Sequence, residues 1–119
     1  MSLLGEWQVR CGGTPNDENP ICLFRTNGPQ VVLDRNFGDD RRDTQTLVNI
    51  HLAPNGAIAF SVPFLTVKPP QTREHVWVKA KDNSGIRVFT NRNADTGEFA
   101  VRDGKFPDGA NTSWFNRCS

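Results

Sequence analysis

Two β-type segments that flank a turn constrain the fold of this chain most strongly. Residues 47–53 and 57–64 are rich in apolar and β-branched side chains, and residues 54–56 between them read Pro-Asn-Gly. Pro54 presets the backbone for a type I turn, and Gly56 supplies the left-handed residue that completes a three-residue loop. The sequence therefore predicts an antiparallel hairpin here.

The length of this loop decides which side chains pair across the hairpin. A two-residue loop would place apolar residues opposite small or polar ones, whereas a three-residue loop creates one continuous apolar face. The predicted pairs are Leu52 with Ile58, Ile50 with Phe60 and Val48 with Val62. We expect these six side chains in the core. The opposite face carries Asn49 and His51 and is a candidate docking surface for a ligand or partner.

The rest of the chain repeats this pattern of short strands and turns. Apolar residues make up only 36% of the 119 residues, and there are 10 Gly and 8 Pro, a balance typical of all-β proteins. Further strands are predicted at residues 4–11, 21–25, 30–34, 75–81, 86–90, 98–102 and 113–118. Because Pro69 and Pro70 cannot continue a ladder, residues 68–73 are expected to cross between sheets or across a barrel end.

These segments predict a single all-β domain over residues 1–119. Strands at regular spacing with hairpin turns between most of them are typical of a barrel or a sandwich. The expected architecture is an antiparallel β-barrel or a two-sheet β-sandwich of about eight or nine short strands. The pattern does not distinguish between these two.

Charge and motif content exclude several functions. A formal net charge of +1 argues against nucleic acid or an anionic membrane as partner, and no apolar run approaches the length of a membrane span. The only histidines, His51 and His75, lie in different strands without a nearby His or Cys, so no metal is expected. No nucleophile–base pattern or phosphate-binding loop is visible. We therefore expect a non-enzymatic protein without a cofactor.

Two aromatic residues provide the strongest candidate for a binding surface. Alternation along its strand places Trp77 on the polar face beside His75 and Lys79. Phe89 lies beside Arg87 on the outer face of the next strand. Aromatic rings among cations stack on sugars or on side chains of a partner protein. The predicted partner is a protein or a glycan, unless this face packs on a second sheet or on another subunit in a homo-oligomer.

The start of the chain resembles that of a known group of small barrels. Residues 4–7, Leu-Gly-Glu-Trp, are similar to the Gly-x-Trp start of the calycins, which include lipocalins, fatty-acid-binding proteins, avidins and certain bacterial protease inhibitors. The resemblance implies that Trp7 closes one end of an up-and-down barrel and that Arg117 packs over it. It also implies a small apolar ligand or an inhibited protease. Trp114, in the last predicted strand, is expected to be a second core tryptophan.

The three cysteines leave the redox compartment open. Cys11 and Cys22 bracket a polar loop and are a possible disulfide if the flanking strands are antiparallel, with Cys118 left over unless it takes one of the other two. A disulfide favours a secreted or periplasmic protein, whereas three free thiols would fit the cytoplasm. Residues 7–11 together with Cys22 are similar to the opening of the invasion-associated locus B family of secreted bacterial proteins.

One functional hypothesis leads and two alternatives follow. The leading hypothesis is a binding domain that recognises a protein or a glycan through exposed aromatic residues and loops rich in Arg and Asn. The first alternative is a calycin-like barrel that binds a small ligand or inhibits a protease. The second is a structural module of a virion or an appendage, whose exposed strand faces are buried on assembly.

Overall fold

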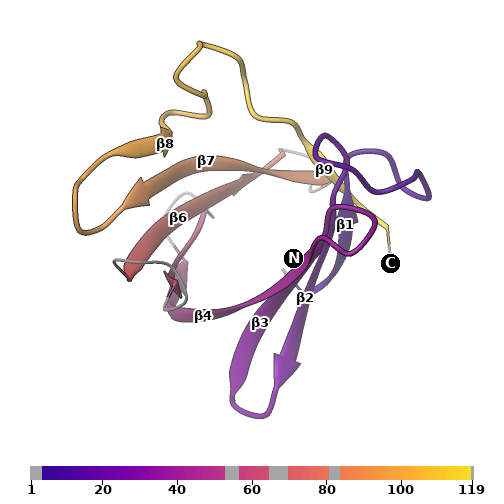
Figure 1. Ribbon diagram of the computed structural model, residues 1–119, viewed down its shortest axis with the longest axis horizontal. Helices are drawn as coiled ribbons and strands as arrows, with labels where there is room; N and C mark the ends of the chain where they lie inside the picture. The colour runs from indigo at the N-terminus through magenta and orange to yellow at the C-terminus, as the bar shows by residue number, and fades with distance from the viewer. Residues whose placement is uncertain (1–3, 53–56, 65–69, 81–83, 119) are drawn as a thin grey trace.

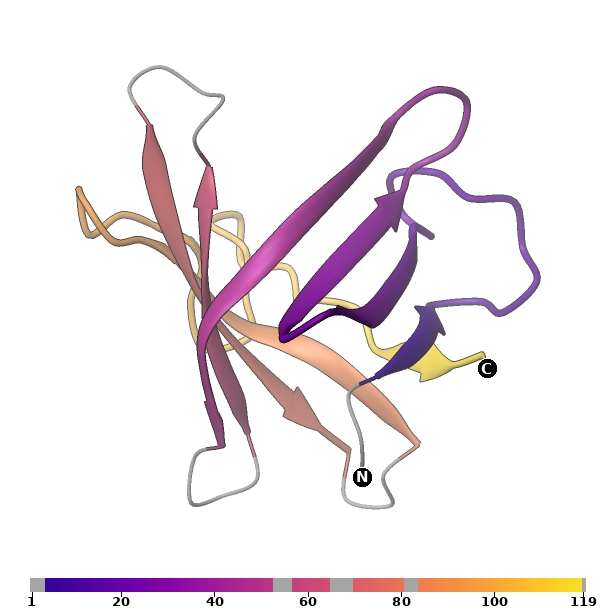
Figure 2. The same ribbon diagram turned by 90° about the horizontal axis from the view of Figure 1, so that it is seen from below.

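The computed structural model describes residues 4–52, 57–64, 70–80 and 84–118. Within these ranges the chain forms nine β-strands and no helix (Figures 1 and 2). The strands are β1 (Gly5–Gln8), β2 (Ile21–Asn27), β3 (Gln30–Asn36), β4 (Arg42–Leu52), β5 (Ile58–Phe64), β6 (Gln71–Lys79), β7 (Gly85–Asn93), β8 (Phe99–Val101) and β9 (Phe115–Arg117). All the pairings between them are antiparallel, which confirms the predicted all-β class.

The sheet closes into a barrel of eight strands rather than splitting into a two-sheet sandwich. Strands β1 to β6 pair in chain order, and β6 pairs with β7. The other edge of β7 pairs with β9, and β9 pairs with β1, so the ring is complete (Figure 1). The remaining strand, β8, pairs with the last part of β7, beyond the region that β9 occupies. Of the two predicted architectures, the closed ring identifies the barrel as the correct one.

The predicted crossover at residues 68–73 is wrong. Strands β5 and β6 pair directly with each other, from Phe64 with Gln71 to Ile58 with Trp77, as the two arms of a hairpin. Pro70 lies just before β6, where a missing N–H removes no ladder hydrogen bond. Pro69 lies outside the described residues.

The central hairpin contains a bulge that changes its register. Leu52 pairs with Ile58 as predicted, but Val48 pairs with Ser61 and the ladder shifts between Val48 and His51. Asn49 adopts a left-handed backbone there, with φ at 54°, a conformation that Asn tolerates better than most residues. The predicted pairs of Ile50 with Phe60 and of Val48 with Val62 are therefore wrong. The turn at residues 54–56 lies outside the described residues.

Only three of the six side chains that we predicted in the core of this hairpin are buried. Ile58, Phe60 and Val62 are buried as predicted, but three predicted core residues of β4 are exposed. These are Val48, Ile50 and Leu52, at 38%, 43% and 74% exposure. Because Leu47 takes the inward position, the next residue must point outward. Leu52 belongs to the last pair of the β4–β5 ladder, where the wall of the barrel ends.

Apolar side chains fill the barrel interior and pack with aromatic contacts between them. The ring centroids of Phe24 and Trp77 lie 5.8 Å apart at 89°, and those of Phe24 and Phe60 lie 6.5 Å apart at 76°. Both are the edge-to-face arrangements that aromatic rings favour. The buried cluster consists of Trp7, Cys22, Phe24, Leu33, Leu47, Ile58, Phe60, Val62, Trp77 and Ile86.

Trp7 of β1 and Arg117 of β9 contact each other where these two strands pair. Trp7 is completely buried, and the guanidinium carbon of Arg117 lies 4.3 Å from its ring centroid. Arg117 also donates a hydrogen bond of 2.8 Å to the carbonyl of Leu4. This is the arrangement that the resemblance to calycins implies for these residues. The expectation for Trp114 is wrong, because Phe115 takes the inward position and Trp114 is 42% exposed.

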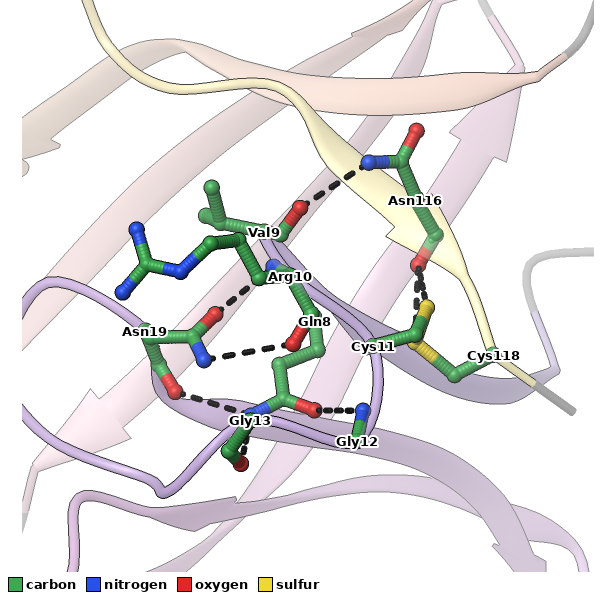
Figure 3. The surroundings of a disulfide bond; sticks show 9 residues. All are labelled: Gln8, Val9, Arg10, Cys11, Gly12, Gly13, Asn19, Asn116 and Cys118. Carbon is green, nitrogen blue, oxygen red and sulfur yellow. Dashed lines mark hydrogen bonds between the residues drawn. A yellow bond between two sulfur atoms is a disulfide. The ribbon is translucent and has the colours of Figure 1, made fainter.

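The disulfide joins Cys11 to Cys118, and the predicted bond between Cys11 and Cys22 is wrong. Cys22 pairs with Trp7 and points into the core, and this burial raises the pKa of its thiol to about 12. Cys11 follows β1, and Cys118 follows the neighbouring strand β9, with 5.5 Å between their Cα atoms. Figure 3 shows the bond at this seam, where the side-chain amide of Asn116 donates to the Val9 carbonyl.

Candidate functional site

A cavity of about 590 Å³ lies at the end of the barrel where β1 and β3 end and β9 begins. The loop at residues 9–20, the end of β3, the middle of β7 and the segment at residues 101–115 surround it. Its apolar lining includes Phe37, Val88, Val101, Phe106 and Phe115. Its polar lining includes Arg10, Asp17, Glu18, Arg35, Asn91 and Thr112. We call this space the mouth cavity.

Two buried polar side chains shape the loop at residues 9–20. The side-chain amide of Gln8 donates to the carbonyls of Gly13 and Asn19, at 2.9 and 3.2 Å. Asn19 accepts a hydrogen bond from the backbone N–H of Arg10 and donates to its carbonyl (Figure 3). Because these side chains satisfy backbone groups that no ladder pairs, this wall of the mouth cavity keeps a defined conformation.

The opposite wall is attached to β7 at an irregularity in the sheet. The ladder between β6 and β7 shifts register between Val76 and Trp77. The Thr112 hydroxyl donates to the Val88 carbonyl at 2.6 Å, and the N–H of Gly104 donates to the Phe89 carbonyl at 2.8 Å. The segment from β8 to β9 is therefore hydrogen-bonded to β7 beside the mouth cavity.

Gly104 lies against the side chain of Arg87 on β7. Its φ of 76° is in the left-handed region, and a Cβ at this position would collide with the guanidinium of Arg87. The same guanidinium carbon lies 5.3 Å from the centroid of the Trp114 ring. Arg87, a predicted binding residue, thus lies between Gly104 and Trp114 and does not line the mouth cavity.

The barrel interior beside the mouth cavity holds polar atoms without partners. Asn91 Oδ1, His75 Nδ1 and Trp77 Nε1 are buried and have no hydrogen-bond partner among the residues that the structure describes. His75 and Asn91 pair directly across β6 and β7. Asn91 also lines the mouth cavity. Each such unpaired buried polar atom costs folding free energy.

Charged groups at the mouth form ion pairs with one another. Arg35 donates two hydrogen bonds to Asp43, one of them 2.8 Å from Nε to Oδ1, and its guanidinium carbon lies 5.1 Å from the Phe37 ring. Arg41 pairs with Asp17 at 2.6 Å, which connects the loop after β3 with the loop after β1. Each of these two ion pairs therefore joins one residue of the charged segment at residues 36–43 to a residue outside it.

The buried imidazole of His75 is neutral at ordinary pH. Burial, together with the positive charges of Arg35 and Arg73, lowers its pKa from 6.5 to about 4. The ring stacks on Phe60 with 5.2 Å between centroids and 10° between planes. His75 is therefore an uncharged group in the wall of the barrel.

This pKa predicts how stability depends on pH. Because the folded-state pKa is about 4 and the unfolded value is 6.5, the unfolded chain binds more protons in this window. The free energy of unfolding should fall as the pH falls from 6.5 towards 4, by up to about 3 kcal/mol from this group. Urea titrations at several pH values should show a smaller fall for His75→Gln than for the wild type. His51→Gln, at an exposed position, is the control, and equal pH dependence in all three proteins would contradict the prediction.

The predicted aromatic surface is wrong. Trp77 is 5% exposed because it pairs with the inward-facing Ile58, and His75 lies in the same row inside the barrel. Phe89 is half-buried. Lys79 is exposed, as are Asn49 and His51 on β4, but these residues do not line the mouth cavity. Alternation alone could not orient β6, because both of its faces carry apolar side chains.

Sequence reasoning missed the residues that form the mouth cavity. Arg35 comes from the end of β3 and Asn91 from β7, while Phe106 and Ser113 come from a loop without regular structure. No motif or spacing connects these positions, and closure of the barrel alone brings them together. The only signal was indirect, namely the long loop at residues 9–20 and the irregular segment before the last strand.

A second hollow of similar volume, about 580 Å³, lies on the outside of the barrel. Leu23, Asp34 and Thr44 of its lining pair across β2, β3 and β4 and point outward. Arg25 and Thr44 both donate hydrogen bonds to Asp34, and the bond from Arg25 lowers the pKa of this carboxyl. Because Asp34 is bonded to Thr44 and Arg35 to Asp43, the outer hollow is the weaker candidate.

The fold and the site define a class: a small antiparallel β-barrel with a partly apolar cavity at one mouth. Among the described residues, no three His, Cys, Asp or Glu side chains are grouped to hold a metal ion. No helix in the same ranges is long and apolar enough to cross a membrane. Comparison of the chain with protein-family models, with curated proteins and with solved structures gives no match.

Proposed function

We propose that this protein is a non-enzymatic binding domain that holds a small amphipathic ligand in the mouth cavity. The observation that carries the proposal is a cavity of about 590 Å³ whose lining combines the apolar side chains of Val88 and Phe115 with polar residues such as Thr112. Ligand sites in proteins have volumes of roughly 300–1,000 Å³ and combine a mostly apolar lining with a few oriented polar groups. The mouth cavity has both properties.

The floor of the mouth cavity supports an apolar body for this ligand. Val88 and Phe115 are partly buried and pack against the core cluster, and both also line the mouth cavity. Phe115 lies 5.8 Å from Trp77 between ring centroids, so an aromatic layer continues below the floor. An apolar ligand that covers Val88 and Phe115 would remove their remaining surface from water.

Small-ligand binding is the first alternative of the sequence hypotheses, and it now takes precedence over recognition of a protein or glycan. The leading hypothesis depended on Trp77 as an exposed ring, and Trp77 is in the core. The contact between Trp7 and Arg117 and the closed barrel support the comparison with calycins, in which barrels hold small ligands. We also propose a secreted or periplasmic location, since disulfides persist mainly in oxidising compartments.

A substitution that fills the mouth cavity tests the proposal. Ser113 is exposed and lines the mouth cavity, so Ser113→Trp should block it without disturbing the core. Methoxynaphthalene is a suitable neutral probe, and we expect its affinity by calorimetry to fall at least about tenfold in this variant, a loss typical of an occluded apolar site. The matched control is Gln30→Trp, an exposed position at the opposite end of the barrel. Equal affinities in the two variants, or no binding to the wild type, would refute the proposal.

A further inference from the structure

One triplet in the segment between β8 and β9 fits the acceptor pattern for N-linked glycosylation. This pattern is Asn, then any residue except Pro, then Ser or Thr, and it marks surface positions of secreted proteins. Residues 111–113 read Asn-Thr-Ser, and no other asparagine among the 119 residues has Ser or Thr two positions later. The sequence therefore contains a single acceptor of this kind, Asn111.

The structure leaves Asn111 open to modification. Its side chain is exposed and makes no hydrogen bond or ion pair with the described part of the chain. It follows a turn that a hydrogen bond from the Phe106 N–H to the Ala110 carbonyl closes, in the segment that runs along the outer side of β7 (Figure 1). A sugar chain on the Asn111 amide would extend into solvent without displacing a packed side chain.

A rarer type of acceptor triplet, in which a thiol replaces the hydroxyl, is blocked by the fold. Residues 116–118 read Asn-Arg-Cys. The side-chain amide of Asn116 donates a hydrogen bond of 2.9 Å to the Val9 carbonyl, and Cys118 is bonded to Cys11 (Figure 3). Ser113, in contrast, is exposed. The structure therefore favours Asn111 over Asn116 as the acceptor.

We propose that Asn111 carries an N-linked glycan. The donor is a lipid-linked oligosaccharide pyrophosphate. The bond between the first sugar carbon and the pyrophosphate breaks, a bond from that carbon to Asn111 Nδ2 forms, and the amide loses one proton as the lipid pyrophosphate leaves. Because Thr112 and Ser113 line the mouth cavity, this glycan stands at its rim. The inference rests on the secreted location proposed above and is independent of the ligand.

Secretion of the full chain from a eukaryotic host, behind a cleavable leader, tests the proposal. Mass spectrometry of the wild type should show one glycan, and peptide N-glycosidase should remove it and leave an aspartate at position 111. Asn111→Gln and Ser113→Ala should both lose the glycan, because each removes a group that the acceptor triplet needs. Asn116→Gln is the matched control and should keep it.

Translation of the same chains with microsomes covers any variant that folds too poorly to be secreted. Transfer of the glycan takes place there on the translocated chain, and only chains protected from added protease are scored. A translocated wild type without a glycan would overturn the proposal. A glycan that persists in Asn111→Gln, or that disappears in Asn116→Gln, would overturn the assignment to Asn111.

Thiol titration distinguishes failure of this inference from failure of the proposed location. A secreted protein without a glycan but with one reactive thiol after denaturation has formed its disulfide, so this result would overturn the glycan alone. Three reactive thiols and no glycan would overturn the glycan and the proposed location together. Ligand binding is measured on unglycosylated protein, so absence of binding there would leave the glycan unaffected.

Discussion

Replacing both Cys11 and Cys118 with serine is expected to lower the free energy of unfolding by about 4–5 kcal/mol. This is the stabilisation expected from a cross-link over roughly 100 residues, because it reduces the conformational entropy of the unfolded chain. The two cysteines are 107 positions apart, so the bond restricts nearly the whole unfolded chain. The folded seam that it joins is short, because β9 has only three residues and two paired positions with each neighbour. Urea denaturation of the variant and of the reduced and oxidised wild type measures the effect.

Thiol titration provides the control for this experiment. In the native oxidised protein Cys22 is buried and the pKa of its thiol is about 12, so no rapidly reacting thiol is expected. After denaturation without reductant, one thiol should react. Two or three reactive thiols at that stage would contradict the bond between Cys11 and Cys118, and so would equal unfolding midpoints with and without reductant.

Trp7→Ala is expected to have the second large effect, a loss of about 3–5 kcal/mol, as is usual for removal of a large aromatic side chain from a core. Trp7 is fully buried, and its loss would also leave the guanidinium of Arg117 without the ring over which it lies. Trp114→Ala is the matched control. Because Trp114 is exposed and its described ring contact is with Arg87, its replacement should cost about 1 kcal/mol. Similar unfolding midpoints for the two variants would contradict this assignment of core and surface.

Turn chemistry and strand alternation were sufficient to predict much of the secondary structure. The predicted strands at residues 21–25 and 30–34 are an example, because they lie within β2 and β3, which form a hairpin. Asn27 pairs with Gln30 across a two-residue loop, and Gly28 has the positive φ that such loops require. The signals there are local, since two adjacent residues specify the turn and the strands on either side follow from it.

It was harder to predict which side chains of a strand face the core. Val48 and Leu47 are adjacent and both apolar, so the pattern of β4 permits either one to face the core. The left-handed residue at Asn49 shifts the register after them, and no local signal marks that bulge. Trp77 was misplaced for a similar reason, because the valines beside it can occupy an outer face as well as an inner one.

The sequence by itself determined that this protein is built from short antiparallel strands, because turn residues and side-chain alternation act over a few neighbouring positions. It also identified Trp7 and Arg117 as partners, through resemblance to other barrels. Only the tertiary structure decided that the sheet closes on itself, that Cys118 bonds to Cys11, and that Asn91 faces a cavity. Each of these depends on pairing between strands far apart in the chain, in particular of β9 with β1 and of β6 with β7. Such pairing results from packing of the whole barrel, which no short segment of sequence specifies.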